Sequence, residues 1–287
     1  LPNAIFLGFT GTPIDKGMLR STVREFGNLI DSYTMTESVS DEITVPIVYE
    51  GRAAKVLLDN SKLQEIEDYY QQCAVAGTNE HQIEASKRVM AQMGSILGDP
   101  DRIKELAEDF IKHYENRVNE GSTIKGKAMF VSSSRLIAYS LYKEIIALRP
   151  EWAKIRECEE GVVLSDIERR EIKPMERIKM VMTRDKDDEP ELYDLLGTSD
   201  YRKELDRQFK NAKSNFKIAI IVDMWLTGFD VPFLDTMYID KPVQRHNLIQ
   251  TISRVNRKFE DKEKGLIIDY VGIKTQMNLA LAMFGGK

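Results

Sequence analysis

The stretch IAIIVDMWLTGFDVP, residues 218–232, decides the fold together with QTISRVNR, residues 250–257. The first begins as an apolar run of the length of a buried strand and ends in a turn that contains Gly228 and the carboxylate of Asp230. In the second, Gln250, Arg254 and Arg257 are four and three positions apart, which predicts that they share one face of a helix. A strand, a glycine turn and a basic helix together indicate a surface that faces a nucleotide or another polyanion.

From residue 126 onward, strand and helix patterns alternate along the chain. We expect strands at 127–131, 177–183, 217–223, 234–239 and 265–270, with helices after 134, at 199–211, at 244–256 and from about 273. This alternation predicts an α/β fold with a parallel, doubly wound sheet and right-handed crossovers. Ligands of such sheets bind at the carboxyl ends of the strands. We therefore expect the polar segments 132–135, 183–184, 227–230 and 240–241 to converge on one rim.

The segment Ser132-Ser133-Ser134-Arg135 joins a predicted strand to a predicted helix. Free amides and hydroxyls at a helix N-terminus attract anions, and the helix dipole adds to this attraction. Simple capping of the helix by a serine is the alternative.

The first 120 residues have a mixed pattern. We expect a buried strand at 4–9 that ends in the turn Thr10-Gly11-Thr12-Pro13, and short strands at 43–49 and 53–58, with Pro46 favouring an edge position. Residues 61–120 follow a helical pattern, and Asp99 or Asp101 caps the last helix. The apolar stripes of these helices are typical of core packing.

Composition excludes several classes of protein. The net charge of −5 supplies no general attraction for nucleic acid, so such binding needs a local patch. Residues 241–258 hold five lysines and arginines and no acidic residue, although a solvated helix face has the same pattern. Two isolated cysteines and three scattered histidines predict no metal site and no disulfide framework, which favours a reducing compartment. No apolar run approaches the ~20 residues that span a bilayer.

Three blocks in this order resemble motifs of superfamily 2 helicases and translocases. Thr10-Gly-Thr-Pro13 resembles motif III, Thr227-Gly-Phe-Asp-Val-Pro232 resembles motif V, and Gln250-Thr-Ile-Ser-Arg-Val-Asn-Arg257 resembles motif VI. Four further segments have sequences similar to those of the restriction (R) subunit of type I restriction–modification enzymes. They are residues 222–232, 238–242, 246–250 and 268–272. The resemblance covers most of the chain and is weakest in the helices of 61–120.

This resemblance implies an ATP-driven motor, with ATP and Mg²⁺ as cofactors, that translocates double-stranded DNA and cleaves it far from the recognition site. The implied partners are the methyltransferase and specificity subunits, in the cytoplasm of a bacterium or archaeon, with no membrane. Two RecA-like domains clamp ATP in that family. Residues 1–13 then correspond to the last strand of the first domain, 14–60 to a β-containing connector, 61–121 to a helical insertion, and 122–287 to the second RecA-like domain.

Three motifs of the family are missing from this sequence. It contains no Gly-x-x-x-x-Gly-Lys-Thr phosphate loop, no Asp-Glu-x-His magnesium motif and no spaced acidic nuclease core. We therefore expect a fragment of the subunit that alone neither hydrolyses ATP nor cuts DNA.

The resemblance also implies roles for single residues. Arg254 and Arg257 are the catalytic candidates, as arginine fingers for the γ-phosphate. The remaining candidates are Gln250, Gly228 and Asp230 for ATP; Ser132, Ser133, Arg135 and Thr227 for DNA; and Thr10, Gly11 and Thr12 for coupling the two. Another superfamily 2 DNA helicase or translocase, or a non-catalytic nucleic-acid-binding domain, are the alternatives.

Overall fold

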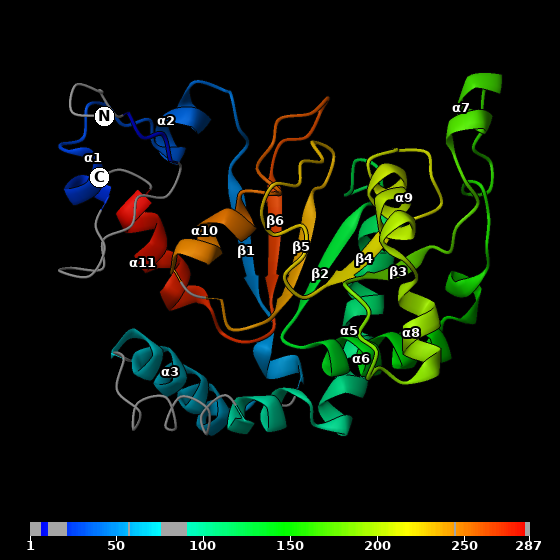
Figure 1. Ribbon diagram of the computed structural model, residues 1–287, viewed down its shortest axis with the longest axis horizontal. Coiled ribbons are helices and arrows are strands. Elements are labelled where there is room, and N and C mark those ends of the chain that lie inside the picture. Colours follow the sequence, from blue (N-terminus) through cyan, green and yellow to red (C-terminus); the bar gives the residue numbers. More distant parts are fainter. Residues whose placement is uncertain (1–6, 11–21, 57, 76–90, 244, 285–287) are drawn as a thin grey trace.

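The computed structural model describes residues 7–10, 22–56, 58–75, 91–243 and 245–284 of the chain. Their strands form one six-stranded sheet in the order β1-β6-β5-β2-β4-β3, and every neighbouring pair is parallel. The strands are β1 (Ile47–Gly51), β2 (Ala128–Ser132), β3 (Ile178–Val181), β4 (Ile218–Ile221), β5 (Thr236–Asp240) and β6 (Gly265–Asp269). Helices lie on both sides of the sheet (Figure 1), so the predicted doubly wound α/β fold is confirmed.

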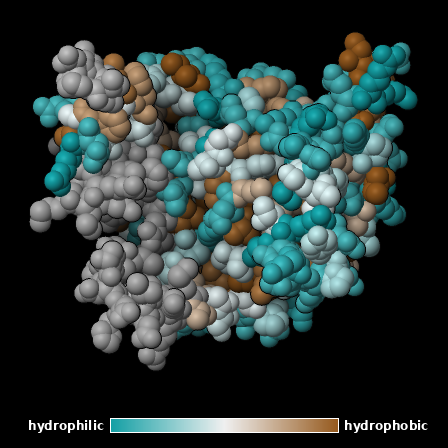
Figure 2. Space-filling view, in the orientation of Figure 1, coloured by the Kyte–Doolittle hydropathy of each residue, from teal (hydrophilic) through white to brown (hydrophobic). Residues whose placement is uncertain are grey.

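The helices connect and cover these strands. Their bounds are α1 (Thr22–Phe26), α2 (Met35–Ser40), α3 (Asn60–Val75), α5 (Pro100–Asn119), α6 (Arg135–Leu148), α7 (Asp166–Glu171), α8 (Pro190–Leu196), α9 (Ser199–Phe209), α10 (Arg245–Ile252) and α11 (Lys274–Phe284), with short 3₁₀ helices η1 (Ala53–Val56) and η2 (Pro150–Ala153). Within the described residues, no helix has both the length and the apolar character needed to span a bilayer. Where Figure 2 is coloured, it shows mainly hydrophilic residues toward the right of this face, with hydrophobic ones near its middle and scattered at its top and right edges.

Strands β2 to β6 form because most of their residues are apolar on both faces of the sheet. All residues of β2 to β6 are buried, as expected for parallel strands covered by helices on both sides. Phe130, Tyr238 and Tyr270 stack across the middle of the sheet, with ring centroids 6.2–6.4 Å apart. The predicted strands therefore match the observed ones to within a few residues.

Strand β1 is only half-buried and lies at the edge of the sheet, as Pro46 predicts. The second strand expected nearby, at 53–58, is wrong, because residues 53–56 form η1. Arg52 N donates to the Asp269 carbonyl as the last rung beside β6, and Lys55 N then bonds back to Arg52. That turn takes the chain out of the sheet.

Helix α5 packs directly against the sheet. Phe110 lies edge-on to Phe130 and Tyr238, with centroids 5.3 and 4.7 Å away. Asp99 caps the helix by accepting from Arg102 N at 3.0 Å, as predicted. Strand β1 and helix α5 thus share a core with residues beyond 122, while the domain boundaries given above remain predictions.

The buried strand expected at 4–9 is wrong for its described part. Residues 7–10 have no strand structure, and Leu7 and Phe9 are 60% and 94% exposed. A strand needs neighbours for its backbone hydrogen bonds, and none of the six described strands pairs with this segment.

A fully buried ion pair ties α5 to the sheet. Arg102 and Asp240 are 1% and 0% exposed; one Arg102 Nη also donates to the Leu97 carbonyl at 3.1 Å. Burial raises the pKa of Asp240 even with the guanidinium beside it.

We expect Arg102→Ala to lower the free energy of unfolding by about 3–5 kcal/mol, because it leaves the Asp240 carboxylate buried without a countercharge. The double variant Arg102→Met/Asp240→Leu removes both charges and is expected to recover most of that loss. Urea denaturation followed by tryptophan fluorescence measures both. A wild-type midpoint for Arg102→Ala would show that the pair does not stabilise the fold.

Candidate functional site

The two predicted arginines do not lie on a helix. The helix expected over 244–256 is confirmed for residues 245–252, where α10 lies, but it ends at Ile252. The shared helical face of Gln250, Arg254 and Arg257 is therefore wrong. Arg254 N and Val255 N bond to carbonyls three residues back, at 3.2 Å each, which closes the last turn. The side chain of Val255 is then fully buried, and Asn256 O accepts from Val45 N at 2.7 Å. Burial of Val255 and this cross-chain bond override the helical spacing.

Arg254 instead holds the turn that follows β4. Its Nε donates to the Leu226 carbonyl at 3.1 Å and its Nη1 to the Phe229 carbonyl at 2.6 Å. Burial, and secondly the charge of Arg257, lowers the pKa of Arg254. The two stretches that decide the fold are therefore joined by a half-buried, charge-assisted contact.

Arg257 pairs with Asp230. Its Nε lies 3.1 Å from Asp230 Oδ1, and the two side chains are 50% and 56% exposed. An ion pair this exposed contributes about 0–1 kcal/mol, so an incoming anion can take the guanidinium at little cost. Asp230 thus holds Arg257 in place through an exposed ion pair.

The turn that carries Asp230 has an unusual backbone conformation at two residues. Gly228 has φ +69, and Trp225 also has a positive φ, of +66. For a bulky side chain such a conformation costs about 1–3 kcal/mol and persists only where the surroundings hold it. Thr227, Gly228 and Asp230 are exposed, so the tip of the turn faces solvent.

The prediction that all polar segments converge on one rim is partly wrong. Ser132 and Asp240 do end neighbouring strands and pair in register, at the carboxyl edge. Asp230 of the predicted segment 227–230, however, pairs with Arg257, and Arg257 bridges to Thr44, just before the amino end of β1. The reason is that the crossover from β5 through α10 must return the chain to the amino end of β6. The arginines and Asp230 therefore form a cluster separate from the carboxyl rim.

The serine segment after β2 is a second cluster. Ser134 Oγ caps α6 by accepting from Ile137 N at 3.3 Å, and Ser132 is fully buried. Among the described residues, Ser133 Oγ is buried without a hydrogen-bond partner. Arg135 donates to the Thr183 carbonyl and forms an ion pair with Asp188, whose side chain is 10% exposed. A phosphate would have to compete with Asp188 for this guanidinium.

The other predicted site residues are less informative. Gln250 is half-buried on α10, and Thr10 is exposed. Gly11 and Thr12 lie outside the described residues.

Sequence reasoning missed two residues of the arginine cluster. Trp225 stacks flat on Phe229, with centroids 4.1 Å apart and planes 3° apart. Lys262 Nζ donates to the Pro232 and Leu234 carbonyls at 3.0 and 2.7 Å, which fixes the end of the turn. No sequence pattern predicts a positive φ at a tryptophan. Lys262 lies in the charged run 261–264, where a lysine is expected to be exposed, so its burial could not be predicted either.

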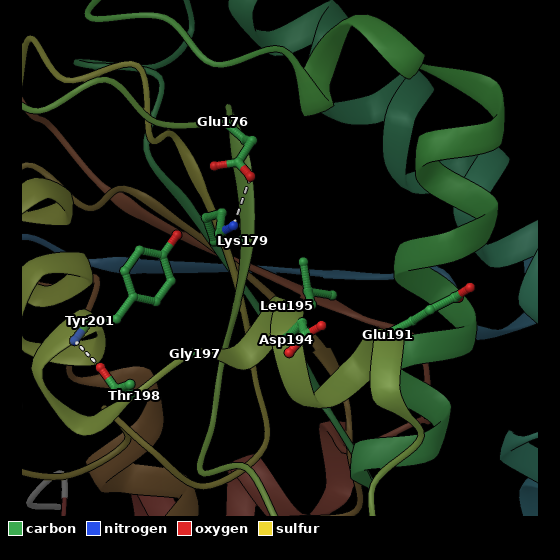
Figure 3. A pocket seen from close by; sticks show the side chains of 8 residues that line it. All are labelled: Glu176, Lys179, Glu191, Asp194, Leu195, Gly197, Thr198 and Tyr201. Atoms are coloured by element: carbon green, nitrogen blue, oxygen red, sulfur yellow. Dashed lines mark hydrogen bonds and ion pairs between the residues drawn. The ribbon is translucent and has the colours of Figure 1, made fainter.

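A hollow beside the edge strand β3 lies outside both clusters. Figure 3 shows Glu176, Glu191 and Asp194 around it, with Lys179 bonded to Glu176 at 2.9 Å. Three carboxylates against one paired lysine disfavour a phosphate ligand, so we do not assign the nucleotide to it. In the described ranges, no group of three or more His, Cys, Asp or Glu is arranged to hold a metal ion.

Comparison with known proteins places the chain. A family model described as type I restriction enzyme subunit R domain 3 matches residues 125–272, more than half of the sequence. The chain belongs to this family. A second model, of the SWI2/SNF2 ATPase, matches residues 1–83. The resemblance to R subunits read from the motifs is thus confirmed.

Curated R-subunit relatives match along the whole chain. The HindI endonuclease subunit of a type I restriction enzyme from Haemophilus influenzae is 38% identical over 287 residues, covering 99% of this chain and 24% of the relative. A protein from Methanocaldococcus jannaschii described as the MjaIXP endonuclease subunit is 35% identical, covering 100% and 25%. The chain spans about a quarter of the length of these relatives.

A solved structure has the same fold. It is a fragment of a protein from Vibrio vulnificus described as an HsdR subunit, with a TM-score of 0.54 and 17% identity, covering 96% of this chain and 41% of that one. The expected RecA-like α/β fold is confirmed.

Lys262 makes the stability of this R-subunit chain depend on pH. Burial lowers its pKa from 10.5 to about 8. Below pH 8 the folded chain carries a charged, poorly hydrated ammonium, and between pH 8 and 10.5 it loses this proton before the unfolded chain does. Stability from this lysine therefore rises with pH across that window.

We expect the difference in unfolding midpoint between wild type and Lys262→Met to shift in favour of wild type from pH 7.5 to pH 9.5. Lys203→Met, at an exposed lysine of α9, controls for the loss of a lysine. A constant difference across that range would contradict the buried charge.

Proposed function

We propose that this chain is part of the ATP-driven DNA-translocating motor of a type I restriction enzyme R subunit. The observation that carries the proposal is the contact of Arg254 and Arg257 with the turn 226–230 in a chain that belongs to this family. The family membership favours this function over another superfamily 2 helicase or a non-catalytic nucleic-acid-binding domain.

The arginine cluster suits phosphoryl transfer. A guanidinium is permanently charged and its planar fork matches phosphate oxygens. Arg257, half-exposed and weakly paired, is the group that reaches the γ-phosphate of ATP held by a partner domain. Arg254, half-buried between two carbonyls, keeps the turn and the exposed Asp230 in place. Mg²⁺ bound with ATP neutralises charge on the phosphates when it is present.

Gly228, Asp230 and Gln250 border the same nucleotide. Gly228 permits close approach of the backbone, since it has no side chain and its φ is positive. Thr10, Gly11 and Thr12 couple the nucleotide state to the grip on DNA. These roles rest on the motif positions of the residues.

Two of the four predicted DNA contacts are accessible to a phosphate. Arg135 of the second cluster offers a guanidinium, and Thr227, at the exposed tip of the 226–230 turn, offers a hydroxyl. Such groups contact the DNA backbone without reading sequence. Ser132 and the Ser133 hydroxyl are buried, so they would shape this surface from beneath. A motor of this kind takes its target choice from partners. We assign that task to the methyltransferase and specificity subunits, with the assembly acting on double-stranded DNA in the cytoplasm.

We expect Arg257→Ala in the full-length subunit to leave ATP binding nearly intact and to lower DNA-stimulated ATP hydrolysis at least ~10²-fold, the low side of an arginine-finger loss. Arg207→Ala is the matched control, because Arg207 is an exposed, paired arginine on α9. Steady-state phosphate release and nucleotide binding measure the two effects. Unchanged turnover in Arg257→Ala would refute the assignment.

The chain of 287 residues by itself is expected to show no ATPase activity with or without DNA, since it carries no phosphate loop. Phosphate release above the background of the Arg257→Ala chain would contradict this expectation.

Asp188→Asn in the full-length subunit tests the second cluster. The amide no longer neutralises Arg135, so we expect tighter DNA binding and a salt dependence steeper by about one counterion. Arg135→Ala is expected to weaken binding and to abolish the effect of Asp188→Asn. Equal affinity of wild type, Asp188→Asn and Arg135→Ala for DNA at several salt concentrations would show that Arg135 does not contact DNA.

A further inference from the structure

We propose that Trp225 is a positioning residue for Arg254. Its ring and its left-handed backbone hold the 226–229 turn so that two carbonyls face one guanidinium. The inference rests on the proposed function, because the contact of Arg254 with this turn keeps Asp230, the partner of Arg257, in place for that reaction.

The backbone at Trp225 is held in place by its surroundings. Among the described residues, Glu42, Trp225 and Glu260 are the ones other than glycine with positive φ, and Trp225 is by far the bulkiest. Leu226 N bonds to the Asp223 carbonyl at 3.4 Å, so the left-handed residue sits inside a closed turn. Such conformations cluster where a site over-determines the backbone.

The stacked rings of Trp225 and Phe229 link the two ends of the 225–229 turn. The two rings are parallel and 4.1 Å apart, and both lean on Phe209, at 5.3 and 6.0 Å. Lys210 Nζ lies 4.9 Å from the centroid of Phe229. Phe209 and Lys210 form the end of α9, so the turn is anchored on a helix outside the two motif stretches.

The two stacked rings belong to residues at or next to the carbonyls that accept from Arg254. Leu226, whose carbonyl accepts from Arg254 Nε, directly follows Trp225, and Phe229 carries the second accepting carbonyl. The stack therefore restrains the backbone that carries both carbonyls. A guanidinium has fixed donor directions, so both bonds form only when the acceptors keep their spacing.

Simple core packing explains this arrangement less well. Trp225 remains only half-buried, unlike the fully buried Phe209 beneath it. A core residue would also need no strained backbone. A packing role predicts that loss of the ring acts equally with and without Arg254, whereas positioning predicts that it acts through Arg254.

The test uses the full-length R subunit with Trp225→Ala and Trp225→Phe, each with Arg254 intact and with Arg254→Ala. We expect Trp225→Ala to lower kcat for DNA-stimulated ATP hydrolysis ~10- to 10²-fold, as for a misplaced group, with KM for ATP within about twofold of wild type. Trp225→Phe keeps a stacking ring and is expected to retain most of the activity. In the Arg254→Ala background, Trp225→Ala is expected to add no further loss.

Tyr142→Ala, which removes a half-buried ring on α6, is the control and should leave kcat unchanged.

Hydrogen–deuterium exchange gives a readout independent of catalysis. Trp225→Ala should speed exchange in peptides covering 222–232 and 250–257 together, while Tyr142→Ala and Trp225→Phe should not. Additive losses in the double variant, equal losses for Phe and Ala, or unchanged exchange at 250–257 would each overturn the inference. If Arg254→Ala retains wild-type turnover, Arg254 has no part in the proposed function, and the exchange data alone decide whether Trp225 positions it.

Discussion

Each crossover of a parallel sheet must carry the chain from the carboxyl end of one strand to the amino end of the next, and this constraint organises the whole molecule. It makes α10 run back across the sheet, so that the residues after it meet the segment before β1. The loop after β4 makes the same return and meets them there. The contact of Arg254 with the Leu226 and Phe229 carbonyls is a direct result of two such returns side by side.

The sequence was enough to predict strands β2 to β6, since they are short, mainly apolar runs that a sheet covered on both faces can bury. Capping was also readable, at Asp99. The end of α10 was not, because the spacing of Arg254 and Arg257 suits a helix and the burial of Val255 is decided by partners distant in sequence. The strand expected at 53–58 failed because a local pattern does not say where the neighbouring strand ends.

The candidate site shows the same division. Its arginines, its glycine and Asp230 were found through their motifs, while the carbonyls that hold Arg254 and the carboxylate that pairs with Arg135 were not. Asp188 lies in a charged loop that reads as solvated, yet it neutralises Arg135 from a largely buried position. Trp225 looks like an ordinary apolar residue, although its backbone is left-handed. Both depend on contacts between segments that no local pattern connects.

The buried pair of Arg102 and Asp240 also bears on how much of the chain makes a self-sufficient folding unit. The family domain is matched from residue 125, but Arg102 lies upstream of it on α5, as does the edge strand β1. A truncation at that boundary would strip away the helix that covers Phe130 and would leave an acid in a dry interior. The smallest piece that keeps the sheet intact starts before β1, so the residues matched by the family model are fewer than those of the folding unit.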